Sequence, residues 1–193
     1  VASADPPPTA LVETEGRRNS SGSSSSTFVH NANAPIEDRL RVFHGRDGVK
    51  AAAVFDGHGG WQVAELAQQR LLPRLVESVR RQRPCNEAGV QRCIDEAFDA
   101  VEEEFTQAAR QAFKLGFGQV ARVGSCALVV LVVDGVLYVA NSGDCRAVLG
   151  TLRGPAQVAA LTHDHNAREP REQLRLSTDH PGEADIVLCK RRS

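Results

Sequence analysis

The 193-residue sequence predicts an α+β fold in which an antiparallel β-sandwich is flanked by helices. Three observations lead to this class. A strand–turn–strand pattern covers residues 39–55, two long helical patterns follow it, and a second pair of apolar runs meets at Asp134-Gly135. Neighbouring strands separated by helices favour layered antiparallel sheets, because a parallel sheet would require strands and helices to alternate.

The first predicted element is a β-hairpin with strands over about residues 39–44 and 49–55. The sequence Gly-Arg-Asp-Gly joins the two runs, and glycine and aspartate are residues that tight turns favour. The position of this turn fixes which residues face each other. Just beyond the strand ends, the register places Asp38 opposite Asp56 and Glu37 opposite Gly57.

A helix is predicted after Gly60, where apolar residues recur every three or four positions. Its apolar face consists of Ala64, Ala67, Leu71, Leu75 and Val79. Pro73 lacks the backbone donor that its own turn needs, so we expect a kink or a restart of the helix there. A second helix has the clearer pattern, and we expect its apolar stripe to pack in the core. That stripe consists of Val90, Ile94, Ala97, Val101, Phe105, Ala108 and Ala112.

The second predicted hairpin turns at Asp134-Gly135, between two runs rich in β-branched residues. These runs are continuously apolar rather than alternating, which indicates strands covered on both faces. The register about this turn places Asp144 across from Ser125. The remaining predicted elements are a strand over about 145–149, a short strand near 158–161 and a helix over about 168–176.

Composition and charge exclude several function classes. The net charge is −1, so the chain lacks the basic excess typical of general nucleic-acid or anionic-membrane binders. Its longest apolar run, residues 127–133, is far shorter than the roughly 20 residues that span a bilayer. Five cysteines without CxxC spacing favour a reducing, intracellular compartment over a disulfide framework.

Residues 1–30 are predicted to form a disordered leader, because this Pro- and Ser-rich stretch holds too little apolar surface to fold. Arg17, Arg18 and the serines are similar to an organelle transit peptide, whereas Glu13 and Glu15 do not fit one. Linker and targeting interpretations therefore both stay open. The chain begins with Val and contains no Met, which indicates a processed, trimmed or partial product.

The register of the first hairpin gathers three carboxylates, those of Glu37, Asp38 and Asp56, in one small space. Such a cluster repels itself unless it is protonated or binds cations. Its oxygen-rich ligand set suits Mg²⁺ or Mn²⁺. Gly57 has no side chain, so its carbonyl could approach an ion held by Asp56, and the glycines that follow would open a helix whose N-terminus favours a phosphate. The alternative is a solvated hairpin end without an ion.

Three further polar stretches allow more than one interpretation. Asp144 in the sequence NSGD either adds an acid to this centre or belongs to a polar turn between strands. His163 and His165 in THDH either bind a metal or lie in a surface loop. Cys126 and Cys145 lie in or beside apolar strands, where a raised thiol pKa would leave them inert.

Five stretches occur in an order and spacing that carry a resemblance. They are IED (36–38), VFDGHGG (54–60), GSCALVVLVV (124–133), NSGDCRAVL (141–149) and LTHDHNAREPRE (161–172). Together they resemble the metal-dependent (PPM, type 2C) protein serine/threonine phosphatase family. The segments ANAPIEDR (32–39) and DHNAREPREQLRL (164–176) are most similar to the pyruvate dehydrogenase phosphatase branch. The resemblance implies that residues 31–193 form the N-terminal portion of a catalytic domain with α-β-β-α layers.

This resemblance also implies a centre for two Mg²⁺ or Mn²⁺ ions. Asp56 resembles the carboxylate that bridges both ions, and Gly57 resembles the residue whose carbonyl binds one of them. Glu37 and Asp38 match the acidic pair that binds an ion directly or through water. Asp38 is therefore a candidate catalytic residue as well as a candidate ligand.

The resemblance assigns two further roles and a reaction. His58 resembles the general acid that protonates the leaving alcohol, and Asp144 matches a position associated with a weaker third metal. The implied reaction is hydrolysis of phosphoserine or phosphothreonine in a phosphoprotein by a metal-activated water, without a phosphoenzyme. On the pyruvate dehydrogenase branch, the substrate would be the E1 subunit of that dehydrogenase and the location mitochondrial. Otherwise the location would be cytoplasmic.

Two departures from the family pattern bear on activity. Asn33 occupies the place where many members carry a basic residue that holds phosphate. The pyruvate dehydrogenase phosphatase branch resembles this chain in having an asparagine-containing segment there. The family's later metal-binding aspartates would follow Ser193, so the chain resembles a domain truncated at its C-terminus. The alternative function is therefore a catalytically inactive fragment or pseudophosphatase that acts as a binding module.

Overall fold

A four-stranded antiparallel sheet forms the centre of the computed structural model, which describes residues 25–29, 34–151, 155–183 and 185–187. Its strands lie in the order β1 (Arg39–His44), β2 (Lys50–His58), β3 (Gly124–Val133) and β4 (Val136–Ser142). A separate two-stranded sheet pairs β5 (Val148–Thr151) with β6 (Gln157–Ala160). The helices are α1 (Gln62–Arg81), α2 (Glu87–Lys114), the 3₁₀ helix η1 (Gly118–Arg122) and α3 (Pro170–Asp179).

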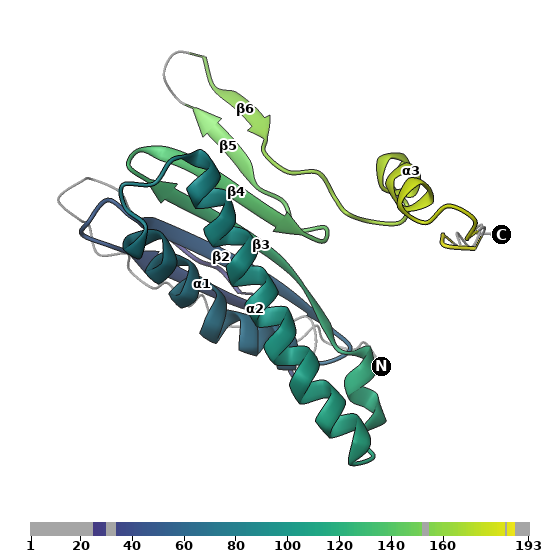
Figure 1. Ribbon diagram of the computed structural model, residues 1–193. Helices are drawn as coiled ribbons and strands as arrows, with labels where there is room; N and C mark the ends of the chain where they lie inside the picture. The colour runs from purple at the N-terminus through teal and green to yellow at the C-terminus, as the bar shows by residue number, and fades with distance from the viewer. Residues whose placement is uncertain (1–24, 30–33, 152–154, 184, 188–193) are drawn as a thin grey trace, which may run out of the picture.

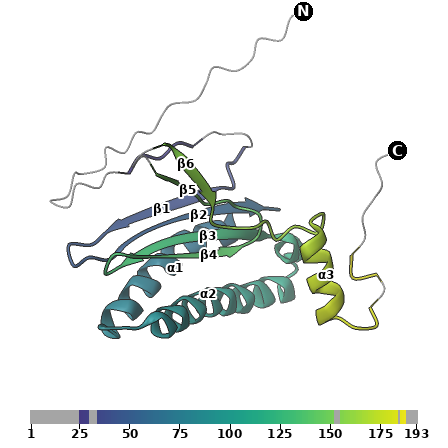
Figure 2. The ribbon, with the colours of Figure 1, turned by 90° about the horizontal axis from the view of Figure 1, so that it is seen from above.

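The helices α1 and α2 and the small sheet lie on opposite faces of the four-stranded sheet. Figure 1 shows α1 and α2 side by side along the sheet. Figure 2 shows both helices below the sheet, β5 and β6 above it, and α3 beyond one end. This is the α+β arrangement of antiparallel sheets with helices that the sequence predicts.

The first hairpin has the predicted register. β1 pairs with β2 so that Arg39 lies opposite Phe55, and one further step along both chains leads to Asp38 and Asp56. The second hairpin is also confirmed, with β3 and β4 paired from Val133 to Ala127.

The turn of the second hairpin explains why its register could be predicted. Asp134 and Gly135 have φ angles of 51° and 84°, as both central residues of a type I′ turn require. The ladder ends where Ala127 faces Ser142, so Asp144 lies just beyond the paired strands.

β2 alternates between a covered face and an open face. Phe55 and the alanines at 51 and 53 are buried and pack with the helices in one apolar cluster. Val54, Asp56 and His58 are exposed on the other face. Strand alternation therefore places Asp56 and His58 on the same side of the sheet, away from the helices.

α1 buries the whole predicted stripe and does not restart at Pro73, so the expected restart is wrong, while the expected kink stays a prediction. The helix is assigned without interruption from Gln62 to Arg81. A proline at position 73 removes the donor for the carbonyl of Gln69. The guanidinium of Arg41 in β1 donates to that carbonyl at 3.3 Å and to the carbonyl of Gln68 at 2.9 Å. A residue of the neighbouring strand thus replaces the missing helical hydrogen bond.

α2 buries the predicted stripe only in its first half. Val90, Ile94, Ala97 and Val101 are buried in the core, whereas Ala108 is exposed. The second half of α2 lies beside η1, and no residue of the helix after Val101 belongs to the main apolar core of the described residues.

The expectation that both faces of the second hairpin are covered holds for β3, none of whose residues is exposed, and is wrong for β4. In β4, Val136 and Leu137 are exposed, and beside this hairpin Val54 of β2 is 44% exposed. β5 and β6 have four residues each, all of them exposed, and they leave much of the open face uncovered.

Several predictions concern residues outside the described ranges. The predicted leader lies there except for residues 25–29, which form neither helix nor strand, and Asn33 and Cys189 lie there as well. None of the helices in the described ranges combines the length and apolar character that a bilayer crossing requires.

We predict that Arg41 and Pro73 are energetically coupled. Arg41→Ala should lower the free energy of unfolding by about 0.5 to 1 kcal/mol, because the carbonyl of Gln69 loses its substitute donor. In a Pro73→Ala background the loss should be smaller, since alanine at this position restores the helical donor. Urea unfolding of the four variants measures the coupling, and equal losses in both backgrounds would contradict it.

Candidate metal centre

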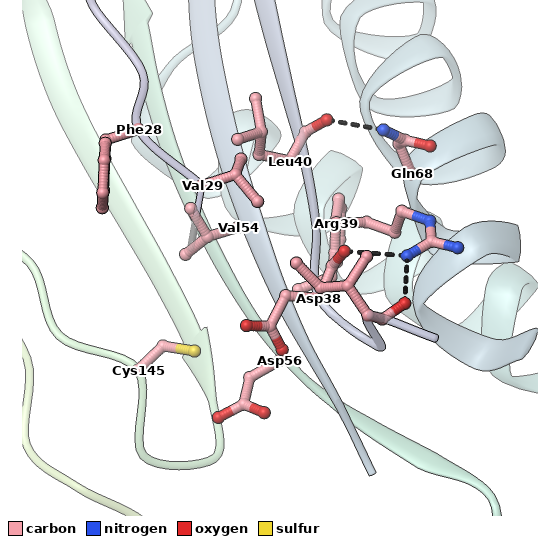
Figure 3. Close-up of a pocket in the computed structure, with 11 residues that line it drawn as sticks. Phe28, Val29, Asp38, Arg39, Leu40, Val54, Asp56, Gln68 and Cys145 are labelled. Carbon is pink, nitrogen blue, oxygen red and sulfur yellow. Dashed lines mark hydrogen bonds between the residues drawn. The ribbon is translucent and has the colours of Figure 1, made fainter. Parts of the chain in front are cut away.

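Acidic side chains from three separate segments meet at one end of the four-stranded sheet. Asp56 lies near the end of β2, Asp38 directly precedes β1, and Asp144 follows β4. Figure 3 shows the carboxylates of Asp38 and Asp56 next to each other, with Cys145 to one side. An open cavity of about 760 Å³ adjoins them, and its wall is otherwise mainly apolar.

Gly57 brings the segment before β1 against β2. A Cβ atom on Gly57 would overlap the carbonyl oxygen of Glu37 and would lie 3.2 Å from the Cβ of Ala64 in α1. Only glycine leaves room for a backbone approach this close. Glu37 therefore lies beside Gly57, as the register of the first hairpin predicts.

The charges of this cluster act on Asp56. Although its side chain is exposed, partial loss of hydration beside the sheet raises the pKa of Asp56, and the carboxylates of Asp38, Asp144 and Glu37 raise it further, while His58 partly opposes them. The shift indicates that ionised Asp56 lacks sufficient positive charge around it. A site with this imbalance and this ligand chemistry suits a divalent cation.

Asp144 is held toward Asp56 by two donors. The thiol of Cys126 donates to Oδ1 at 3.4 Å, and the side-chain amide of Asn166 donates to Oδ2 at 3.1 Å. These hydrogen bonds lower the pKa of Asp144, and the one from Asn166 has the larger effect. Asp56, Cys126 and Asp144 each offer a ligand atom within 4.8 Å of the others. The acid interpretation of NSGD is thus favoured over that of an isolated polar turn.

Cys126 is the residue of this cluster that the sequence did not predict as a candidate ligand. It faces Asp56 across the β2–β3 ladder, a pairing between segments separated by both long helices. The predicted rise in thiol pKa is confirmed, because burial raises the pKa of Cys126 and raises that of Cys145 to about 11. Both thiols are therefore protonated and poorly reactive at neutral pH.

The THDHN segment supports the loop that carries Asp144. His165 donates its backbone N–H to the carbonyl of Gly143 at 2.9 Å, and Asn141 donates to the carbonyl of His163 at 3.2 Å. Arg146 binds both carboxylate oxygens of Asp164, at 2.8 and 2.6 Å. Among the described residues, neither histidine belongs to a group of potential metal ligands. The surface-loop interpretation of THDH is the better one.

His58 and the glycines after it occupy close-packed positions. The imidazole lies over Gly124 in β3, where any Cβ would overlap Nε2. Gly59 has a φ of 69°, and a Cβ there would overlap the carbonyl oxygen of Arg122. Gly59 is thus required by backbone packing and Gly124 by the His58 ring, whether or not an ion binds, while phosphate binding at the start of α1 stays a prediction.

We predict that Gly57→Ala destabilises the chain by about 1 to 3 kcal/mol, because the new methyl group must displace the backbone of Glu37. Gly150→Ala in β5 is the matched control, since a Cβ there meets nothing within 4 Å. Its effect should stay within about 0.5 kcal/mol. Urea unfolding of the metal-free chain compares the two, and equal stabilities would contradict the close approach at Gly57.

Comparison with known proteins agrees with the motifs. A family model described as "Protein phosphatase 2C" matches residues 12–190. "Probable protein phosphatase 2C 78" of Oryza sativa subsp. japonica is 39% identical over 170 residues, covering 86% of this chain and 42% of that protein. "Probable protein phosphatase 2C 34" of Oryza sativa subsp. indica is 35% identical over 184 residues, covering 94% and 47%. The chain thus spans less than half the length of these two relatives.

Two solved structures share the fold. A serine-threonine phosphatase 2C from Toxoplasma gondii has a TM-score of 0.53 over 90% of this chain and 57% of its own. A C. elegans sex determining protein has a TM-score of 0.56 over 86% of this chain and 36% of its own. Both are 20% identical to this chain, so they inform on the fold alone. The family model, which spans nearly all of the sequence, establishes that the chain belongs to the protein phosphatase 2C family.

Proposed function

We propose that residues 31–193 are the N-terminal portion of a catalytic domain that hydrolyses phosphoserine and phosphothreonine in proteins. The observation that carries this proposal is the convergence of Asp38, Asp56 and Asp144 at one end of the sheet, where partial desolvation and then the neighbouring carboxylates raise the pKa of Asp56. The chain belongs to the protein phosphatase 2C family, and cations bound by this cluster would both serve the reaction and offset the repulsion among its carboxylates.

The chain's own residues fit Mg²⁺ or Mn²⁺. Asp56 and Asp38 supply carboxylate oxygens on the open face of the sheet, and Gly57 lies at the same place without a side chain to block its carbonyl. Glu37 and Asp144 add negative charge. Hard divalent cations prefer such oxygen donors. We propose two ions per complete catalytic domain, with Asp56 shared between them and Asp144 contributing to a weaker third position.

Ions bound there would lower the pKa of a bound water and neutralise the phosphate oxygens, which permits direct hydrolysis without a phosphoenzyme. The protein residues would orient the reaction. Asp38 would hold the attacking water, and His58, on the same face of β2 as Asp56, would donate a proton to the leaving serine or threonine oxygen. Asn166 would keep Asp144 directed toward the centre.

A finer assignment within the family is the pyruvate dehydrogenase phosphatase branch. This assignment rests on the sequence similarity of residues 32–39 and 164–176 to that branch. It implies phosphorylated pyruvate dehydrogenase E1 as the substrate and a mitochondrial location. The relatives' names specify protein phosphatase 2C and add no support for this branch. Microscopy of the tagged native protein tests it, because an entirely cytosolic signal would overturn it.

Phosphopeptide hydrolysis with Mn²⁺ tests the proposed activity, in the 193-residue chain and in the longest form that its gene encodes. Asp56→Asn should lower the rate at least about 100-fold, because the shared ligand loses its charge. Asp95→Asn, on an exposed position of α2, is the matched control and should retain activity. Activity that survives both Asp56→Asn and a chelator would contradict the mechanism. Phosphopeptide binding without Mn²⁺ binding would instead favour the pseudophosphatase.

The same substitution has an opposite effect on stability. The pKa of Asp56 is raised in the folded state, so its ionised form costs stability at neutral pH, and that cost vanishes as the pH falls and Asp56 becomes protonated. Asp56→Asn should therefore stabilise the metal-free chain at pH 7 by up to about 1 kcal/mol, with a smaller gain at pH 4. Thermal unfolding in EDTA measures this. A destabilised Asp56→Asn variant at pH 7 would contradict the repulsion.

A further inference from the structure

We infer that Arg39 is a positioning residue that holds the segment of Glu37 and Asp38 in place for metal binding. The inference rests on the proposed function, because it concerns the same site. Arg39 is the first residue of β1 and directly follows the acidic pair, yet its side chain turns back toward that pair and toward α1.

The guanidinium of Arg39 binds the acidic segment at two points. Its Nη1 donates to the carbonyl oxygens of Ile36 and Asp38, each at 2.9 Å. Figure 3 draws these two bonds as dashed lines. The two carbonyls lie on either side of Glu37, so one nitrogen atom fixes the backbone that carries both acids.

The other end of the same guanidinium is anchored to α1. Nε donates to Oε2 of Glu65 at 2.6 Å, and the group lies 5.9 Å from the centre of the Trp61 ring. The side chains of Arg39 and Glu65 are only 20% and 32% exposed, so this ion pair is partly protected from solvent. A charge-assisted bond of this kind is stronger than a neutral one. It links the acidic segment to the first turn of a helix packed in the core.

Gly57 limits the segment on its other side. The carbonyl of Glu37 lies where a Cβ of residue 57 would be, so the segment is confined between β2 and the Arg39 side chain. Repulsion from Asp56 acts on Glu37 and Asp38 and would otherwise favour their displacement. Arg39 supplies the restraint that keeps these acids beside Asp56 before an ion arrives.

Arg41 provides an internal comparison for a purely structural role. It lies two residues further along β1 and also donates to α1, through the carbonyls of Gln68 and Gln69. The hydrogen bonds described for Arg41 do not include the acidic segment. Two arginines of one strand therefore tie β1 to the same helix, and only Arg39 also binds the backbone of Ile36 and Asp38.

Calorimetric titration with Mn²⁺ alone, on the 193-residue chain, tests the inference without an activity assay. Arg39→Ala should weaken Mn²⁺ binding about 10- to 100-fold, the range expected for residues that orient metal ligands. Arg41→Ala should stay within about twofold of the unmodified chain, because its loss leaves the acids in place. Arg39→Lys should give an intermediate loss, since lysine keeps the charge but lacks the planar fork of donors.

Backbone carbonyl ¹³C chemical shifts of the metal-free chain give a second, independent readout, because both arginines donate to carbonyl groups. Arg39→Ala should shift the carbonyl signals of Ile36 and Asp38, whereas Arg41→Ala should shift those of Gln68 and Gln69. Glu65→Gln serves if Arg39→Ala fails to fold, because it keeps the side-chain shape while it removes the charge and one acceptor oxygen of the anchor. It should weaken Mn²⁺ binding about 2- to 10-fold relative to the unmodified chain, and an unchanged affinity would overturn the positioning role.

The outcomes separate the inference from the proposed function. Equal Mn²⁺ affinities for the Arg39 and Arg41 variants, or unchanged carbonyl signals of Ile36 and Asp38 in Arg39→Ala, would overturn the positioning role and leave the metal centre intact. An unmodified chain that binds no Mn²⁺ would overturn the proposed centre itself, and the positioning role would fall with it.

Discussion

The carboxylates of Asp38, Asp56 and Asp144 repel one another, and the polypeptide must hold them at one end of the sheet against that repulsion. No single contact does this. The β1–β2 ladder aligns the first two acids, and Asn166 and Cys126 hold the third. Each of these restraints is weak in solvent, so the cluster depends on elements that cannot move separately. The rigid apolar layer beneath β2 provides that resistance.

β2 divides its two tasks by simple alternation. Phe55 faces the helices and belongs to the core, while its neighbour Asp56 points to the open face. The stability of the strand and the chemistry of the site therefore reside in different residues of one segment. Gly57 joins the two tasks, because it faces α1 and also admits the backbone of Glu37.

The parts of this structure that could be predicted from the sequence are those that local chemistry determines. The Asp134-Gly135 turn and the Gly-Arg-Asp-Gly turn set both hairpin registers, and helical spacing identified the buried stripe of α1. The failures involve contacts between distant segments. A hydrogen bond from Arg41 compensates for Pro73, and Cys126 reaches Asp56 only through the β2–β3 pairing, which no single turn specifies. How far β5 and β6 cover the open face of the four-stranded sheet also depends on contacts between segments, which the spacing of apolar residues does not predict.

The alternation of β2 also determines how the site can fail. A slip of one residue between β1 and β2 would exchange the two faces of a strand, because side chains alternate with a period of two. Because β2 is also paired with β3, the exchange would fall on the edge strand β1, and the position beside the acidic segment would no longer be a glycine. No intermediate register offers a weaker version of the same centre. The placement of Glu37 and Asp38 beside Asp56 is therefore cooperative with the pairing of β1 to β2, whereas Asp144 depends on the β2–β3 pairing and on its own hydrogen bonds.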